Sequence, residues 1–231
     1  MVDLTTNYLG LTLRNPIIVG SSGLTDSTDK IKKLASHGAG AVVLKSIFEE
    51  EITHEYEKSV AEEAPKRYKD EFLDYLDYRI REQNIENYVN LIAGAKNTVD
   101  IPVIASVNCA SKHEWTNFAK EIEDAGADAL EVNMFVLPSN LNNTPEENEK
   151  LYFEVVNALN EKLSIPVSLK ISYYFSNLAL TIKKLSESGI NGLVLFNRFY
   201  SPDFDIDKME VTSGSVLSHP DEMNMTLRWI A

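Results

Sequence analysis

The chain has 231 residues, 44% of them hydrophobic, which is enough for one globular domain with a sizeable core. Its formal net charge of -13 argues against a nucleic-acid partner, because a phosphate backbone is bound by basic surfaces. The single cysteine, Cys109, excludes an internal disulfide and fits a reducing compartment. No secretory signal and no apolar run of about 20 residues is visible. We therefore expect a cytoplasmic protein that binds neither nucleic acid nor a membrane.

The sequence of the first 23 residues predicts a small hairpin, followed by a turn that suits close contact with a ligand. Leucines alternate around Gly10 within residues 3–14, a pattern that predicts a β-hairpin closing the bottom of the fold. The strand opened by Asn15-Pro16 then ends in Gly20-Ser21-Ser22-Gly23. Two hydroxyl groups between glycines allow the backbone to approach a flat or phosphorylated ligand closely. An ordinary strand-to-helix turn is the alternative interpretation.

Six short apolar segments share a design that predicts the strands of a parallel sheet. Three open with a glycine where a helix should stop, and three open near a proline. Each ends on Gly, Lys, Ser or Asn. These segments are 15–20, 38–46, 101–108, 126–133, 165–170 and 189–197.

Helical patterns separate the strands and set the fold class. Their signals are Asp26 or Ser27 as a cap, the capping boxes Ser111-Lys112-His113-Glu114 and Thr144-Pro145-Glu146-Glu147, and apolar spacing at 85–92 and 178–185. Alternating strands and helices predict an α/β fold with right-handed βαβ units. Polar residues at the strand ends favour a (β/α)8 TIM barrel over a doubly wound sheet.

Two features of length bear on domain organisation. Residues 48–83 are highly charged, carry aromatic anchors, and are too long for a bare connection, so we expect an insert, either a lid or a subunit contact, within a single domain of residues 1–231.

A closed barrel needs eight strands, and about six units are present before the chain ends at Ala231. We expect a barrel that is incomplete at its C-terminus or completed by another chain. The last two loops, which often bind phosphate in such barrels, would then be missing.

Amides and amines end most of the predicted strands. They are Lys45 with Ser46, Asn108, Asn133, Lys170 and Asn197. Because the carboxyl ends of parallel strands converge, these side chains predict one binding mouth for a ligand rich in ring carbonyls and nitrogens. Solvated loop lysines, or a Schiff-base lyase using Lys45 or Lys170, are alternatives. No two histidines have metal-ligand spacing, so we expect no metal site.

The ordered set resembles the dihydroorotate dehydrogenase family, the FMN-dependent barrels of pyrimidine biosynthesis, over the first six of its eight units. The matching residues are Asn15-Pro16, the turn 20–23, Lys45-Ser46, Asn108, Asn133, Lys170 with Tyr174-Phe175, and Asn197. The absence of an N-terminal apolar helix resembles the soluble class 1 enzymes. The resemblance implies an oxidoreductase acting on the CH-CH bond of dihydroorotate or a similar cyclic amide, with hydride transfer to flavin N5.

The resemblance also assigns roles to residues. It implies FMN held by Ser21, Ser22, Gly23, Lys45, Ser46, Asn108, Asn133 and Lys170, and substrate held by Asn133, Asn140 and Asn197. Lys45 and Lys170 would be catalytic, with Lys170 near N1–C2=O of the flavin, where its charge stabilises the reduced ring. A small-molecule substrate and a homodimer are the expected partners. Fumarate, NAD through a partner subunit, and a quinone all remain possible electron acceptors.

One position departs from the family pattern. The family carries a Cys or Ser as its base three residues after the amide that matches Asn133, and here that position is Val136. Valine cannot accept a proton. A shifted alignment would place Ser139 there. The alternative function is therefore a base-deficient, flavin-binding relative that does not turn over dihydroorotate.

Overall fold

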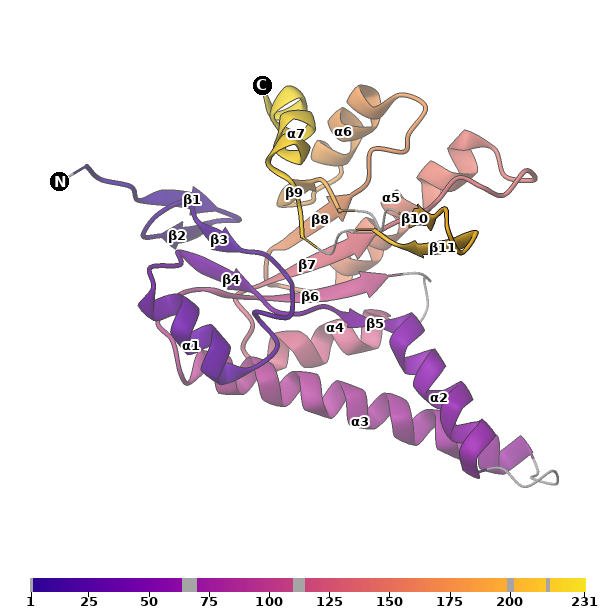
Figure 1. Ribbon diagram of the computed structural model, residues 1–231. Coiled ribbons are helices and arrows are strands. Elements are labelled where there is room, and N and C mark those ends of the chain that lie inside the picture. The colour runs from indigo at the N-terminus through magenta and orange to yellow at the C-terminus, as the bar shows by residue number, and fades with distance from the viewer. Residues whose placement is uncertain (1, 64–69, 110–114, 199–201, 215–216) are drawn as a thin grey trace.

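The computed structural model describes residues 2–63, 70–109, 115–198, 202–214 and 217–231 (Figure 1). Its centre is a curled, open sheet of seven parallel strands in the order β3-β4-β6-β7-β8-β9, with β5 also paired to β6. The strands are β3 Ile18–Val19, β4 Ala41–Val43, β5 Ile47–Phe48, β6 Val103–Cys109, β7 Ala129–Met134, β8 Val167–Ile171 and β9 Gly192–Leu195. All six predicted strand segments are confirmed, and so is the predicted partial TIM barrel.

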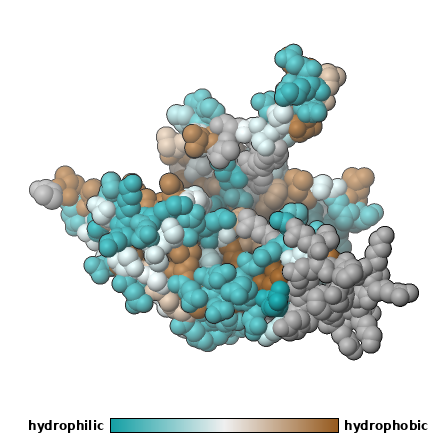
Figure 2. Space-filling model, turned by 60° about the horizontal axis from the view of Figure 1, so that its bottom comes forward, coloured by the Kyte–Doolittle hydropathy of each residue, from teal (hydrophilic) through white to brown (hydrophobic). Residues whose placement is uncertain are grey.

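Helices follow the strands along one face of the sheet. They are α1 Thr28–Ser36, α3 Asp70–Lys96, α4 Trp115–Asp124, α5 Pro145–Lys162 and α6 Leu178–Ser186. Figure 1 shows α1, α3 and α4 side by side below the sheet, and the contacts between neighbouring helices agree. The large apolar core lies between these helices and the outward side chains of the strands. The face brought forward in Figure 2 is largely hydrophilic, as expected for the outer surface of such a layer.

Local sequence signals explain where the helices begin and end. Thr144 caps α5 with both bonds of a capping box, and Pro145 occupies the first turn, as predicted. Ser27 is the N-cap residue of α1, although its side chain makes no capping bond. Positive φ angles at Gly38, Gly126 and Gly189 follow the ends of α1, α4 and α6. The capping box predicted at 111–114 lies outside the described residues.

The N-terminal hairpin covers the other face of the sheet at its amino end. Its strands β1 Thr6–Tyr8 and β2 Leu11–Leu13 are antiparallel, as predicted. Leu9 and Leu13 pack there with Val43 and Ile104 in a second, smaller core. The approach is so close that a Cβ atom at Gly192 would lie 2.6 Å from Leu9 Cδ2. The hairpin therefore closes the bottom of the concave face.

Two further segments lie outside this framework. Helix α2, Glu49–Glu63, packs against α3, and Figure 1 shows the pair projecting from the sheet. Helix α3 runs without a break through residue 83, so the expected insert is helical where it is described, and its role as a lid or subunit contact stays a prediction. After β9 the chain forms an antiparallel hairpin of β10 Pro202–Asp205 and β11 Glu210–Ser213, and η1 Pro220–Glu222 leads into α7 Met223–Ile230. Within the described ranges, no helix combines the length and apolarity needed to cross a membrane.

Candidate functional site

Three predicted site residues lie side by side across the centre of the sheet. Asn108 of β6 is paired in register with Asn133 of β7, which is paired with Lys170 of β8. Because side chains alternate between the two faces of a strand, residues paired in this way point to the same face. The same pairing two residues earlier joins Ser106, Glu131 and Ser168. The concave face therefore has two polar levels above the small core that the hairpin closes. The upper level is the row Asn108, Asn133 and Lys170, and the lower level is the row Ser106, Glu131 and Ser168.

The upper level holds an unpaired buried acceptor. Asn133 is 7% exposed, and its Oδ1 has no hydrogen-bond partner among the described residues. Ser168 Oγ, one level below on the neighbouring strand, is buried and also lacks a partner there. Unsatisfied buried polar atoms are costly, and they are often satisfied by a ligand or by ordered water. Asn133 Oδ1 therefore marks the place where a ligand carrying an N–H donor fits best.

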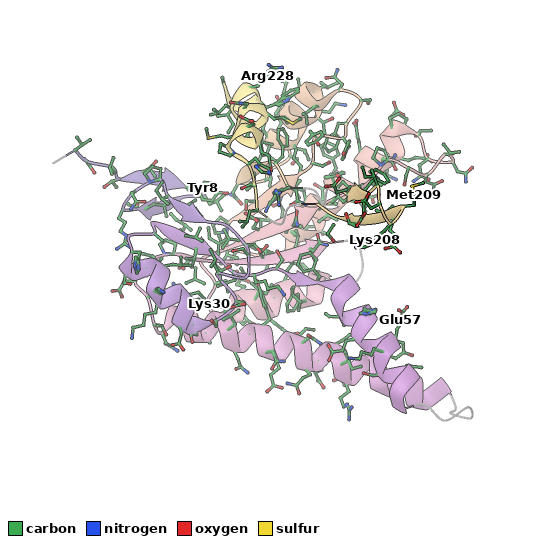
Figure 3. The ribbon with its side chains drawn as sticks, viewed as in Figure 1. Tyr8, Lys30, Glu57, Lys208, Met209 and Arg228 are labelled. Atoms are coloured by element: carbon green, nitrogen blue, oxygen red, sulfur yellow. The ribbon has the colours of Figure 1, made fainter. Side chains whose placement is uncertain are left out.

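A buried ion pair connects the two levels. Lys170 Nζ lies 3.8 Å from Glu131 Oε1, and the Lys170 side chain is 19% exposed while Glu131 is 5% exposed. Burial raises the pKa of Glu131, and the positive charge of Lys170 opposes that shift. Burial likewise raises the pKa of Tyr8, whose hydroxyl feels the charge of Glu131 from the hairpin below. Figure 3 labels Tyr8 at the turn end of that hairpin.

A break between β4 and β5 places Lys45 and Ser46 beside these levels. Both strands pair with β6, but three residues, 44–46, stand opposite two residues of β6, 105–106, so the register shifts by one between them. The Tyr88 hydroxyl fills the break: it accepts from Ser106 N at 2.7 Å and donates to Ser106 O at 2.8 Å. Ser46 Oγ lies 2.7 Å from Ser106 Oγ, and Ser46 N donates to Ser21 Oγ at 2.8 Å. Ser21, Ser46 and Ser106 thus form a chain of hydroxyls along one side of the mouth.

Three other predicted site residues, Lys45, Ser22 and Gly23, are exposed. Lys45 is exposed next to this hydroxyl chain, and its N–H donates to Thr25 O. Ser22 and Gly23 are exposed in the turn after β3, where Ser22 Oγ accepts from Leu24 N. The assignment of Ser22 and Gly23 to FMN binding and the alternative of an ordinary turn both stay predictions, whereas Ser21 lies in the hydroxyl chain.

Asn140 lies in the exposed loop after β7. Its side chain bonds within that loop, to Asn143 Oδ1 at 3.2 Å and to Asn142 N at 3.0 Å. Nothing brings it to the row of Asn133 in the described structure. Its assignment to substrate binding stays a prediction.

Aromatic rings follow the last residues of β8 and β9. Tyr173 contacts both Tyr174 and Phe196, with ring centroids 4.8 Å and 5.8 Å apart. A cavity of about 730 Å³ beside them is lined in part by Asn197. A neighbouring cavity of about 410 Å³ includes Val136, whose N–H donates to Tyr152 OH at 3.2 Å. Flat, partly apolar ligands suit such walls.

Comparison with known proteins decides the family. The model of the family described as dihydroorotate dehydrogenase matches residues 3–215. The chain belongs to the dihydroorotate dehydrogenase family. The predicted resemblance is thereby confirmed at the level of the family.

The individual relatives are distant. The catalytic subunit of dihydroorotate dehydrogenase B (NAD(+)) from Thermoplasma acidophilum is 28% identical over 89% of this chain and 66% of its own length. The protein of the same name from Thermoplasma volcanium is 29% identical over 89% of this chain and 65% of its own length. The NAD-dependent dihydropyrimidine dehydrogenase subunit PreA of Escherichia coli K12 is 22% identical over 84% of this chain and 48% of its own length. The chain thus spans about two thirds of the length of the first two relatives.

Structural likenesses are weaker still. A solved phosphonopyruvate hydrolase in complex with oxalate and Mg++ aligns with a TM-score of 0.49 at 13% identity, over 82% of this chain and 61% of that one. This likeness carries no functional argument. Among the described residues, no group of three or more His, Cys, Asp or Glu side chains could hold a metal ion.

The dihydroorotate dehydrogenase family implies FMN, and the site can be tested against it. An isoalloxazine ring offers one N–H donor and several carbonyl and ring-nitrogen acceptors. The concave face supplies the orphan acceptor Asn133 Oδ1, the amide of Asn108 and the ammonium of Lys170 in one row. These groups complement the ring end of FMN in both hydrogen bonding and charge.

Several residues of the site were not predicted from the sequence. Glu131, Ser106 and Ser168 each precede a predicted site residue by two positions, so strand periodicity alone signals that they share its face. Tyr88 lies within the helical pattern predicted at 85–92, which gives it no role in the site. Tyr8 reaches the site through the packing of the hairpin, for which the sequence holds no local signal.

Proposed function

We propose that the chain forms the flavin-binding part of an FMN-dependent oxidoreductase that oxidises dihydroorotate or a similar cyclic amide. The observation that carries the proposal is the row of Asn108, Asn133 and Lys170, with the unsatisfied Asn133 Oδ1 at its centre. FMN, when bound, would supply the hydride acceptor at N5. The names of the relatives, all dehydrogenases of dihydroorotate or dihydropyrimidines, support this class of substrate.

The residues of the chain would bind and orient the two reactants. Asn133 would accept the ring N–H of the flavin, with Asn108 beside it. Lys170 would place its ammonium against the edge of the ring that gains negative charge on reduction. Ser21 and Ser46 would line the side of the mouth, with Lys45 at its rim. Asn197 and the ring of Tyr173 would hold the substrate in the larger cavity.

A titration of FMN tests the cofactor. We expect FMN fluorescence to be quenched on adding the purified protein and a protein-bound visible spectrum to appear. Asn133→Leu should weaken this binding by about tenfold or more, since a buried hydrogen bond is worth about 0.5–1.5 kcal/mol net and its loss leaves a polar group of the ligand unpaired. Asn157→Leu removes an exposed amide from α5 and should leave binding unchanged.

The outcome discriminates between reaction classes. No FMN binding to the unmodified protein would contradict the oxidoreductase. Borohydride trapping of a carbonyl substrate on Lys45 or Lys170 would then support the Schiff-base lyase. Bound FMN that is reduced by dihydroorotate or dihydrouracil without oxygen supports the proposed reaction and names the substrate.

A second candidate function follows from Val136. Oxidation across a CH-CH bond removes a hydride from one carbon and a proton from the next, and Val136 cannot accept that proton. A flavin-binding relative without dihydroorotate turnover would have the same row of residues. It predicts bound FMN that dihydroorotate does not reduce.

The partners complete the proposal. We infer a small-molecule substrate, a cytoplasmic location and a homodimer, and light scattering of the purified protein checks the homodimer. The relatives named as NAD(+) enzymes favour NAD, reached through another subunit, among the possible electron acceptors. Steady-state assays with NAD, fumarate and a quinone analogue compare the three directly.

A further inference from the structure

A buried carboxylate lies directly beneath the row of flavin-facing residues. Glu131 is 5% exposed and occupies the centre of the second polar level, between Ser106 and Ser168. Lys170 Nζ, one level above on the next strand, lies 3.8 Å from Glu131 Oε1. The carboxylate therefore contacts the ammonium from below, on the side away from the mouth.

The fold itself gives little reason for a charge at this position. A buried carboxylate is expensive unless it is paired, and replacing a buried ion pair by well-packed apolar residues is often neutral or stabilising. The level below is already apolar, with Ile104 and Ala129 packed against the hairpin. A function at the mouth explains the carboxylate better than stability does.

We propose that Glu131 is a positioning residue for Lys170: it holds the ammonium at the flavin edge and offsets part of its charge, and so lowers the midpoint potential of the bound flavin. This inference rests on the proposed FMN function. A positive charge beside the ring favours the reduced flavin, which carries additional negative charge. A carboxylate behind that positive charge weakens the effect, because it contributes a potential of opposite sign.

The charge of Glu131 depends on Lys170. The groups that act on Glu131 are Lys170 of β8, Tyr8 of β1 and Tyr88 of α3, and burial raises the pKa of both tyrosines, so neither supplies a charge near neutral pH. Burial alone favours the protonated carboxyl, and the ammonium of Lys170 favours the carboxylate. Removing Lys170 should therefore raise the pKa of Glu131 further and also remove the charge through which it acts, so that a further change to Gln has a smaller effect.

A double-mutant cycle on the midpoint potential tests the inference. In the FMN-loaded protein, Glu131→Gln should raise the two-electron potential by at least about 30 mV, which is a tenfold change in the reduction equilibrium. In the Lys170→Met background the same change should alter that equilibrium by less than about threefold. Redox titration against reference dyes, with the bound spectrum as the signal, measures all four proteins.

Two further variants separate this role from a structural one. Glu131→Asp keeps the charge and should stay within about threefold of the unmodified equilibrium. Glu187→Gln removes an equal charge from an exposed pair with Lys183, also 3.8 Å apart, and should leave the potential unchanged. It controls for the general effect of losing one negative charge.

Each outcome bears on a different statement. An unchanged potential in FMN-loaded Glu131→Gln would overturn the inference while leaving the proposed function intact. Equal shifts in the presence and absence of Lys170 would show that Glu131 does not act through that residue, which also overturns it. If Glu131→Gln binds no FMN, then Glu131→Asp decides, because a potential far from that of the unmodified protein contradicts the inference. Failure of the unmodified protein to bind FMN overturns both proposals.

Discussion

A single hydroxyl, that of Tyr88, closes the gap that the β4–β5 break leaves in the sheet. It donates to the C=O of Ser106 and accepts from its N–H, at the point where the register of the sheet shifts between β4 and β5. Burial raises the pKa of Tyr88, so the group stays a neutral hydroxyl that both donates and accepts. Its position explains how Lys45 and Ser46 leave the ladder without exposing the core.

Tyr88→Phe should therefore destabilise the protein by about 1–3 kcal/mol, because it removes both hydrogen bonds to the buried backbone of Ser106 while preserving the ring. Urea unfolding followed by circular dichroism measures the change. Tyr78→Phe, on the exposed part of the same helix, is the matched control and should cost less than about 0.5 kcal/mol. Equal losses in the two variants would show that the break is held by other contacts.

At Val136 a substitution should increase activity rather than decrease stability. If the missing base limits dihydroorotate oxidation, Val136→Cys should raise the rate of FMN reduction by roughly 100-fold, the lower range for a placed general base. Anaerobic stopped-flow bleaching of the flavin measures this rate. Val99→Cys, at a partly buried site after α3, controls for a new thiol. No gain would indicate that another group already removes the proton, or that the substrate is different.

The residues at the ends of neighbouring strands could be predicted from the sequence, and those that reach the site from a helix or a loop could not. Asn108, Asn133 and Lys170 could be placed together because polar residues that end neighbouring parallel strands must converge. Tyr88 could not be predicted, since its bonds to Ser106 join a helix to a strand break that no local pattern marks. Asn140 shows the converse, because its loop is free to turn the side chain to its own neighbours.

At the scale of elements, Glu123 fastens the end of α4 to the start of β8. Its Oε1 accepts from Ser164 N at 2.9 Å, from Ile165 N at 3.1 Å and from the Ser164 hydroxyl, while Oε2 pairs with Lys120. Lys120 and these hydrogen bonds lower the pKa of Glu123 to about 2. The carboxylate thus replaces backbone contacts where one βα unit passes to the next.

This tether predicts a pH-dependent stability. Because the folded pKa lies below the ordinary value of 4.5, the stabilisation is fully present above that value and is lost as the pH falls toward 2. Glu123→Gln should lower the free energy of unfolding by about 1–3 kcal/mol at pH 7, and by clearly less at pH 3. Urea unfolding at pH 7, 5 and 3 measures the difference.

Glu121→Gln, exposed on the same helix, provides the comparison for Glu123→Gln. It should change stability by less than about 0.5 kcal/mol at each pH. A Glu123→Gln loss that stays constant from pH 7 to pH 3 would contradict the tether.

The positions of the strands were predicted better from the sequence than the length of helix α3. Glycine stops, prolines and apolar runs predicted all six strand segments and the N-terminal hairpin, because each signal acts locally on the backbone. The charged stretch 48–83 was expected to be an insert, and its described part is helical: α3 begins at Asp70 and continues beyond the stretch to Lys96. Neither Gly nor Pro interrupts residues 70–93, so the sequence had allowed one long helix.

At the scale of the whole molecule, the proposed ligand would join strands far apart in the chain. The row from Asn108 to Lys170 spans three adjacent strands of an open sheet whose edges are β3 and β9. The binding site exists only in the folded sheet, since the unfolded chain holds these side chains apart. Ligand binding must therefore stabilise the fold by mass action.

FMN at 100 times its Kd should add about 2.7 kcal/mol to the stability. For a chain of this size each kcal/mol moves Tm by about 2–4 °C, so the expected rise is roughly 5–11 °C in a thermal scan. Riboflavin, which has the ring without the phosphate, should give a similar rise at the same concentration as FMN. Adenosine monophosphate, a phosphate ester without the isoalloxazine, should give none. A rise with adenosine monophosphate equal to that with FMN would place the binding energy in the phosphate and contradict a ring site at Asn133.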